Sequence, residues 1–473
     1  MTDGLAAATL AELAAAVGAD GLRVDPADRW AYSYDNSRRQ RLPGAVVVPS
    51  SEEQVQAVVR ICRAHGVALC ARGLGTGTAG AAVPPEGGLV ISTERMTALR
   101  IDAPNRVAVV QPGATNGEVQ RAAAEHGFFW PPDPTSANYS TVGGNLACNA
   151  AGPKAVKYGT PRENALGLRA VAGTGELLTT GCYTTKGVVG YDLTRLIIGS
   201  EGTLAVITEA TLKLTPLPGE VRVLRLLFNS VVGAAAAVTR LMGQPVVPRA
   251  VEFADSSALR LIRDYASVEL PDNARAMLMV EAEGGADIDA NVAALIDAAQ
   301  GEGLVEARAA RSAEEGAELW RARKALSPAL RTIAPKKINE DVVVPVSEMA
   351  SFIGQMETLS AKYGFPIVCF GHAGNGNIHV NLLIDPDDEA QMAGAEACLA
   401  EVFDAVLKRR GTLSGEHGIG YDKREFVGLE LDPVALGLMR AIKRQFDPDG
   451  VLNPGKLFPT DTAGQTDTTG AQS

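Results

Sequence analysis

A glycine-rich run after a predicted strand constrains the fold of this chain more than any other feature. The strand covers residues 67–71 and leads into Arg72–Gly80, where Gly75, Gly77 and Gly80 have the spacing of a dinucleotide-binding loop. Such a loop must open a helix whose N-terminus receives the diphosphate. The next residues prevent that helix, since they include Pro84, Pro85, Gly87 and Gly88. The run therefore argues against a Rossmann fold and favours a loop whose backbone amides surround a phosphate.

A second segment, residues 131–160, is rich in glycine, asparagine and serine and indicates the same ligand. It lies between more regular segments, and long ordered loops are usually functional. A surface loop without a ligand would not need so many positions where only the backbone can approach. We therefore expect the two loops to share one phosphate-containing ligand.

Regular elements surround these loops. We expect a strand over 45–48, then a helix that starts at a capping box of Ser50 and Glu53. The predicted buried face of this helix is Val55, Val58, Val59 and Cys62. A hairpin is expected over 168–180 and a strand pair over 196–207.

The segment Pro216–Gly219 marks the best boundary between two halves of the chain. In the second half the expected strands cover 221–228, 277–283, 342–346 and 366–370. The expected helices cover 231–242, 288–299 and 313–326. This split alternation of helix and strand indicates an α+β sandwich.

Three of the five histidines lie in two short motifs of the second half. His372 and His379 flank a glycine-rich turn between two apolar runs, which predicts strand, turn and strand. Strand alternation then places His379 and Asn381 on one face. Glu416 and His417 form the core of the second motif.

Two imidazoles and a carboxylate can hold a divalent ion and leave positions open for a substrate. Because Glu416 and His417 are adjacent, one can bind the ion while the other handles a proton. A purely structural role stays open for either motif taken alone, as it does for His65 and His126 at predicted helix ends. Both motifs together, in a chain with so few histidines, favour a metal site.

Composition argues against several other classes. The net charge of −11, with both signs interspersed, argues against nucleic acid or an anionic membrane as partner. No uncharged apolar stretch reaches about 18 residues, so we expect no membrane span. The six cysteines are far apart and form no Cys-x-x-Cys. This pattern predicts reduced, mostly buried thiols, a cytoplasmic protein and no iron–sulfur cluster.

Several of these motifs, in this order, resemble one known superfamily. Arg72–Gly77, Thr141–Asn145, Gly199–Leu204 and Gly450–Lys456 look like the FAD-binding domain of the PCMH-type (vanillyl-alcohol oxidase) superfamily. The histidine motifs resemble its FAD-linked oxidase C-terminal branch. That branch contains D-lactate dehydrogenases, the glycolate oxidase flavoprotein subunit and D-2-hydroxyglutarate dehydrogenases.

The resemblance implies that FAD is bound, and bound without a covalent link. Some members of the superfamily tether the flavin to a histidine in the first glycine loop, and this chain has none between Arg72 and Gly80. The implied cofactor-binding residues are Arg72, Gly73, Gly75, Thr76, Gly77, Pro132, Asp133, Thr141, Gly143, Gly144, Asn145, Gly152, Gly159, Glu201, Gly202, Ile207 and Asn453.

The resemblance also implies roles in the second half. His372, His379 and Glu416 would bind a divalent metal, with zinc as the implied ion, and His417 would be the base. Asn381 and Arg323 would contact the substrate, with Arg323 anchoring its carboxylate.

Two of these substrate contacts stay open. Arg323 could equally be one of the solvated helix charges around Arg321 and Lys324. Residues 336–341 depart from the pattern of the D-2-hydroxyglutarate-specific members, which leaves Lys337 as the candidate for a second substrate carboxylate.

The implied function is oxidation of a D-2-hydroxy acid (D-lactate, D-2-hydroxyglutarate or glycolate) to the 2-oxo acid. His417 would take the hydroxyl proton while a hydride passes to flavin N5. The electrons would leave to a separate acceptor, an electron-transfer flavoprotein, a quinone or a cytochrome. One alternative is a non-catalytic or partner-dependent subunit of a larger oxidase complex. The other is a transferase like alkyl-dihydroxyacetonephosphate synthase, although its run of histidines is missing here. The oligomeric state stays open, a homodimer included.

The fold implied is α+β, with a two-subdomain FAD-binding domain and a substrate cap domain built on a largely antiparallel sheet. A C-terminal helical segment returns to the flavin. The predicted segments are an N-terminal helical part (1–40), the FAD-binding domain (41–218), the cap domain (219–420), the returning segment (421–459) and a disordered tail (460–473).

Overall fold

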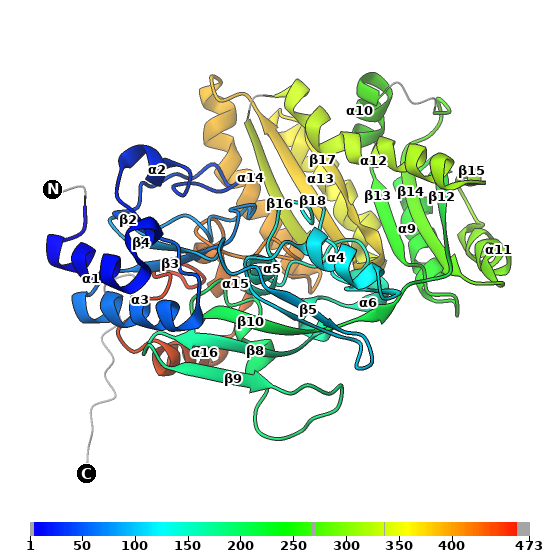
Figure 1. Ribbon diagram of the computed structural model, residues 1–473. Coiled ribbons are helices and arrows are strands. Elements are labelled where there is room, and N and C mark those ends of the chain that lie inside the picture. Colours follow the sequence, from blue (N-terminus) through cyan, green and yellow to red (C-terminus); the bar gives the residue numbers. More distant parts are fainter. Residues whose placement is uncertain (1–3, 267–269, 335, 461–473) are drawn as a thin grey trace, which may run out of the picture.

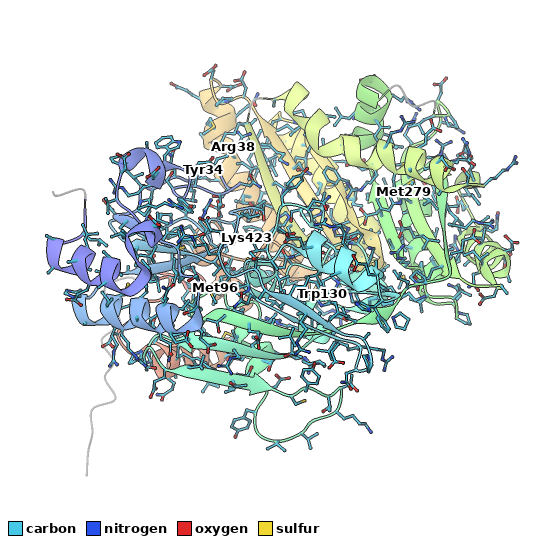
Figure 2. The ribbon with its side chains drawn as sticks, in the orientation of Figure 1. Tyr34, Arg38, Met96, Trp130, Met279 and Lys423 are labelled. Atoms are coloured by element: carbon cyan, nitrogen blue, oxygen red, sulfur yellow. The ribbon has the colours of Figure 1, made fainter. Side chains whose placement is uncertain are left out.

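The computed structural model describes residues 4–266, 270–334 and 336–460. Figure 1 shows two β-rich halves side by side, and the chain returns from the second half to the first near its C-terminal end. The cores of the halves are separate: Trp130 lies in one and Met279 in the other, and Figure 2 labels both. Of the predicted tail only Thr460 lies within the described residues.

The first half begins with a four-stranded sheet in the order β1-β2-β4-β3, in which β2, β4 and β3 run parallel. Its strands are β1 (Leu22–Arg23), β2 (Ala45–Val47), β3 (Leu69–Arg72) and β4 (Leu89–Ser92). Its helices are α1 (Ala7–Val17), the 3-10 turn η1 (Ala19–Gly21), α2 (Pro26–Trp30) and α3 (Glu52–His65). The apolar face predicted for α3 is buried against the sheet, as expected.

A five-stranded antiparallel sheet completes the first half, in the order β5-β6-β10-β8-β9. Its strands are β5 (Leu99–Asp102), β6 (Val107–Val110), β8 (Ala165–Ala172), β9 (Leu177–Gly181) and β10 (Ala205–Lys213). Around it lie α4 (Asn116–Ala124), α5 (Val142–Cys148), α6 (Ala155–Tyr158), α7 (Pro161–Asn164) and α8 (Leu193–Ile197). The short strands β7 (Phe128–Phe129) and β11 (Thr215–Pro216) pair with each other.

The second half is a seven-stranded antiparallel sheet in the order β15-β12-β14-β13-β17-β18-β16. These strands are β12 (Glu220–Phe228), β13 (Ala250–Ala254), β14 (Ala276–Gly284), β15 (Leu304–Ala309), β16 (Lys336–Val343), β17 (Ile367–His372) and β18 (Asn377–Ile384). The change from β11 to β12 falls at the predicted boundary, and the predicted antiparallel cap sheet is confirmed.

Helices cover both faces of this sheet. One face packs against α9 (Val231–Met242), α11 (Ile288–Ala299), α13 (Met349–Tyr363) and α14 (Glu389–Lys408). The other packs against α10 (Ser256–Ala266) and α12 (Ala313–Ile333). The remaining elements are η2 (Val346–Glu348), η3 (Ala373–Asn375), η4 (Arg424–Phe426), α15 (Val427–Glu430) and α16 (Pro433–Phe446).

Three local predictions are wrong. The cap of α3 is Ser51, whose hydroxyl accepts from the backbone N–H of Gln54, because the helix starts one residue later than expected. The strand pair predicted from residue 196 does not start there, because residues 196 and 197 end helix α8, which the Asp192 carboxylate caps at its start. The strand predicted over 342–346 is β16 over 336–343; its start was missed because five of its first six residues are polar or charged.

The long segment 131–160 is also more regular than predicted. It contains α5 and α6 instead of being a loop throughout. Thr141 caps α5 by accepting from the backbone N–H of Gly144, so two of the predicted cofactor glycines, Gly143 and Gly144, lie in the first turn of a short helix.

Candidate functional site

A cavity of about 2450 Å³ lies between the two halves and is lined by residues of both. Its volume exceeds the ~300–1,000 Å³ of ordinary small-ligand pockets, which is room for a large cofactor and a substrate together. Most of the predicted cofactor residues line it: Arg72, Gly73, Gly75, Thr76, Gly77, Asp133, Thr141, Gly143, Gly144, Asn145, Glu201, Gly202 and Ile207.

The other four predicted cofactor residues are not among those that line the cavity, and each contacts other protein groups. The Pro132 carbonyl accepts from the Asn116 amide at 2.9 Å. Gly159 ends α6 in a left-handed conformation, where a Cβ would meet the Glu163 side chain. The side-chain amide of Asn453 donates to the carbonyls of Ala81 and Glu201.

The fourth of them, Gly152, reaches across to the other half. Its backbone N–H donates to Glu416 Oε2 at 2.9 Å, so the first half contacts one of the predicted metal ligands directly.

The first glycine loop is shaped by close packing. A Cβ at Gly73 would collide with the Thr141 hydroxyl, and one at Gly75, whose φ is +69°, would collide with the Arg72 guanidinium. Gly77 differs, because the nearest protein atom to its Cβ position is Asp35 Oδ2 at 3.8 Å. Gly77 therefore leaves open space on the cavity side, where a ligand's phosphates can approach the backbone.

We expect Gly77→Val to weaken FAD binding while leaving the fold intact. The valine side chain would occupy cavity space and not protein space, and overpacking of this kind costs about 1–3 kcal/mol, or roughly 5–150-fold in affinity. Fluorescence titration of apoprotein with FAD measures the affinity, and thermal unfolding checks the fold. Gly354→Val, at an exposed and uncrowded position of α13, is the control. Unchanged FAD affinity in Gly77→Val would place the cofactor elsewhere.

The three predicted metal ligands converge on one point beside this cavity. His372 ends β17, His379 lies on β18, and the antiparallel pairing of these strands brings the two rings to 5.2 Å between centroids. Glu416 Oε1 lies 3.1 Å from His372 Nε2 and 3.8 Å from His379 Nε2. One nitrogen from each ring and the carboxylate oxygen all lie within 4.8 Å of one another, which suits a divalent ion.

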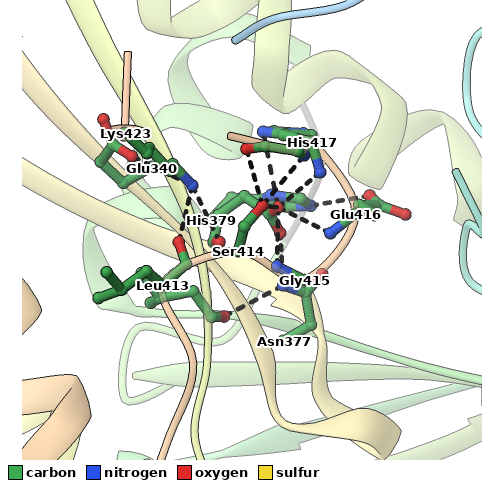
Figure 3. Close-up of polar contacts among 12 residues, drawn as sticks. Glu340, Asn377, His379, Leu413, Ser414, Gly415, Glu416, His417 and Lys423 are labelled. Carbon is green, nitrogen blue, oxygen red and sulfur yellow. Dashed lines mark hydrogen bonds and ion pairs between the residues drawn. The ribbon is translucent and has the colours of Figure 1, made fainter. Parts of the chain in front are cut away.

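The loop that carries Glu416 and His417 is held by one buried carboxylate. Asp341 Oδ2 accepts from the backbone N–H groups of Gly415, Glu416 and His417 at 3.0, 2.8 and 2.7 Å, and from the Ser414 hydroxyl at 3.2 Å. Figure 3 shows these contacts, with Asn377 on one side and Lys423 on the other. Three amides on one oxygen fix the path of the loop, and with it the places of the carboxylate and the imidazole.

The charges of the histidines follow from their surroundings. Burial opposes a charged imidazole, but the carboxylates of Glu252 and Glu416 outweigh it and raise the pKa of His372 to about 10. Burial, with the neighbouring His417 and His372, lowers the pKa of His379 to about 3. His379 is therefore neutral, and its buried Nδ1 has no hydrogen-bond partner among the described residues. A neutral imidazole is what a metal ligand requires, and His372 would release a proton when an ion binds.

A second donor group, Asp341, His379 and His417, also lies within ligand distance. Its carboxylate is already occupied, since Asp341 Oδ2 has four donors and Oδ1 accepts from the Asn377 amide at 2.6 Å. His417 is stacked on His379 with the rings 5.2 Å apart and is left beside the first group. The geometry therefore favours His372, His379 and Glu416 as the ion site, with His417 next to it.

Of the three predicted substrate contacts, two line the cavity and one is buried in the sheet. Arg323 on α12 and Lys337 on β16 line the cavity, and the Arg323 guanidinium lies over the Phe370 ring at 4.8 Å. Asn381 is fully buried below the histidines, where its amide donates to the carbonyls of Val368 and His379. Its place indicates a role in shaping the strand pair.

Sequence reasoning missed two carboxylates at this site, Asp341 and Glu252. Each had a signal in the sequence. Glu252 is the one charged residue of the apolar strand Ala250–Ala254, and Asp341 immediately precedes the apolar residues 342–344. A charged side chain at the core position of a strand is rarely buried unless it has partners.

The two halves also meet through Glu201, which has φ 53° in the turn before β10. Its buried carboxylate accepts from the backbone N–H groups of Ile419 and Gly420, just beyond His417. Through these two hydrogen bonds, the turn at Glu201 holds the loop that carries the second histidine motif.

A glycine loop with open space on the cavity side in one half, and a candidate ion site beside the His417 imidazole in the other, are compatible with a cofactor-dependent enzyme. Two family models match the chain: "FAD binding domain" over residues 43–181 and "FAD linked oxidases, C-terminal domain" over 217–457. The chain belongs to the family of FAD-linked oxidases and is an FAD-dependent oxidoreductase. The predicted superfamily and fold class are confirmed.

Curated relatives match over nearly their whole length. The chain is 38% identical to glycolate oxidase subunit GlcD of Bacillus subtilis, covering 92% of this chain and 93% of that protein. It is 36% identical to a D-lactate dehydrogenase of Archaeoglobus fulgidus, with 90% and 95% covered. It is also 36% identical to a D-2-hydroxyglutarate dehydrogenase of Xanthomonas citri, with 95% and 96% covered.

A solved structure of p-cresol methylhydroxylase has the same fold. The TM-score is 0.77 at 19% identity, with 96% of each chain covered. Among the residues that the structure describes, no helix is both long and apolar enough to cross a membrane. All six cysteines are free, and four of them are buried, as predicted.

Proposed function

We propose that this protein oxidises a D-2-hydroxy acid to the 2-oxo acid with non-covalent FAD and a divalent ion, and that zinc is that ion. The observation that carries the proposal is the convergence of His372, His379 and Glu416 beside His417 on the wall of the FAD cavity. Relatives named for glycolate, D-lactate and D-2-hydroxyglutarate support the substrate class.

The residues of this chain divide the work. When bound, FAD supplies the hydride-accepting group and the ion supplies a Lewis acid that lowers the pKa of the substrate hydroxyl. Arg323 holds the substrate carboxylate through a guanidinium fixed over Phe370. His417, held by Asp341 through its backbone N–H, takes the hydroxyl proton. Lys337, on the same cavity wall, is the candidate partner for a second carboxylate.

The electrons then pass to a separate acceptor, an electron-transfer flavoprotein, a quinone or a cytochrome. We place the reaction in the cytoplasm and leave a homodimer open. A non-catalytic subunit is the second candidate, because several relatives are themselves named as subunits. Solved alkyldihydroxyacetonephosphate synthases match at 19% and 21% identity, which concerns the fold alone.

Stopped-flow mixing of the purified protein with D- and L-2-hydroxy acids tests the function. We expect a D-2-hydroxy acid to bleach the flavin anaerobically, and its L-enantiomer to react much more slowly. A flavin that no hydroxy acid reduces would contradict the proposed activity and support the subunit alternative.

We expect acid precipitation to release the flavin, leaving a colourless pellet and a yellow supernatant. The reason is that residues 72–80 contain no histidine, and among the described residues the histidines that line the cavity are the proposed ligands His372 and His379 and the proposed base His417. Absorbance of both fractions at flavin wavelengths is the measurement. A yellow pellet would show a covalent flavin.

A further inference from the structure

We propose that Glu252 is a positioning residue that fixes the spacing between the ion site and the carboxylate anchor. Its side chain is 2% exposed, and each of its oxygens contacts a different functional residue. Oε1 lies 2.5 Å from His372 Nδ1, and Oε2 lies 2.7 Å from the Arg323 guanidinium. This inference rests on the proposed function, since it assigns a shared support to two of its groups.

The strand order puts Glu252 in this place. β13 lies beside β17, with Glu252 directly opposite His372. Val251 and Phe253 point into the core under α9, α11, α13 and α14, so Glu252 projects from the opposite face, toward α12 and Arg323. A buried carboxylate is costly unless it is paired, and here both of its partners belong to the site.

The contact with His372 determines which ring nitrogen faces the ion. When an ion takes the place of the Nε2 proton, Nδ1 still donates to Glu252, so Nε2, the nitrogen that faces Glu416, is the one that would bind the ion. A carboxylate behind a metal-binding histidine fixes the ring and makes it a better ligand.

The contact with Arg323 orients the other anchor. The guanidinium is held at one end by Glu252 and lies on the Phe370 ring, so it has little freedom to turn. A 2-hydroxy acid has its hydroxyl and carboxylate on adjacent carbons, and productive binding therefore needs the ion and the arginine at one spacing. A single rigid carboxylate between His372 and Arg323 supplies that spacing.

The test measures the two anchors separately in FAD-loaded protein. Zn²⁺ affinity is measured by competition with a chromophoric chelator. Propionate has a carboxylate but no hydroxyl, so its inhibition constant measures how well Arg323 binds a carboxylate. Glu252→Gln should weaken Zn²⁺ binding by about 10–100-fold, the usual effect of losing such a partner. The same variant should raise the inhibition constant of propionate and the KM of the hydroxy acid.

Three comparisons make these effects specific. Arg323→Lys should weaken the binding of propionate and leave the affinity for Zn²⁺ unchanged. His372→Ala should weaken the binding of Zn²⁺ and leave that of propionate unchanged. Asp255→Asn is the matched control, because Asp255 is a buried carboxylate directly after the same strand, and the backbone N–H groups of Ala258 and Cys369 donate to it. It should lower the unfolding temperature without changing either affinity.

A Glu252→Gln protein in which only one affinity falls, or neither, overturns the proposal. If that variant does not fold, Glu252→Asp repeats the test, since its shorter carboxylate keeps the charge but cannot span both partners. A wild-type protein that binds no divalent ion instead overturns the proposed function, and this inference with it.

Discussion

His372→Ala and His379→Ala should each lose the divalent ion and flavin reduction together. Each substitution removes one of three ligands that meet within 4.8 Å, and the remaining two cannot hold an ion tightly. Without the ion the substrate hydroxyl keeps its ordinary pKa, so flavin reduction should slow on the order of 10³-fold. Elemental analysis and anaerobic stopped-flow measure the two losses on the same samples.

Two controls accompany these variants. His65→Ala removes an imidazole that pairs with Glu12 at the surface, and it should change neither ion content nor rate. Prolonged chelation of the wild-type protein should abolish turnover and leave the flavin spectrum in place, since the glycine loop and the ion site belong to different halves. Active enzyme that contains no stoichiometric divalent ion would contradict the metal site.

Glu416→Gln and His417→Asn should have different effects although the residues are adjacent. His417→Asn should keep FAD and the ion but slow flavin reduction by roughly 10²–10⁴-fold, the scale for losing a positioned base. Glu416→Gln should instead lower the affinity for the ion, because a neutral amide oxygen is a poorer ligand for a dication. Stopped-flow rates at saturating Zn²⁺ separate the two variants, since added ion restores only Glu416→Gln.

The structure makes His417→Asn a clean test. Asp341 accepts from the backbone N–H of residue 417, which the substitution keeps, so the only contact with Asp341 that it removes is that of the imidazole Nδ1, 4.0 Å from Oδ2. A normal rate in His417→Asn would show that the imidazole is structural, and another group would have to take the proton. Asp341→Asn is the corresponding loop control: its amide keeps one acceptor oxygen but puts a donor in place of the other, so it cannot accept from both Asn377 and the loop, and it should affect the ion and the rate together.

Much of this site could be predicted from the sequence because its groups lie in short local motifs. His372 and His379 flank one turn, and the period of a strand is enough to orient His379. The exclusion of a Rossmann helix after Gly80 was equally local, since prolines decide it, and the structure has no helix there.

The contacts that complete the site could not be predicted in the same way. Glu252 lies 120 residues before His372. The two meet only because β13 pairs with β17, a strand that is not its neighbour along the chain. The bond from Gly152 to Glu416 spans 264 residues. Spacing along the chain contains no information about such long-range pairings. The start of strand β16 is misplaced for a local reason, because five of its first six residues are polar or charged and the usual apolar pattern is missing.

The contacts that residues 451–456 make with Leu69 and Ala81 have a consequence for the synthesis of the protein in the cell. Residues 451–453 pair with Leu69, and the side chains of Asn453 and Lys456 bond the carbonyl of Ala81, next to the first glycine loop. A ribosome therefore releases that loop long before the segment that supports it has been synthesised. Stable uptake of FAD by the nascent chain should wait until about residue 456 has left the exit tunnel, so cofactor loading is a late step of biosynthesis.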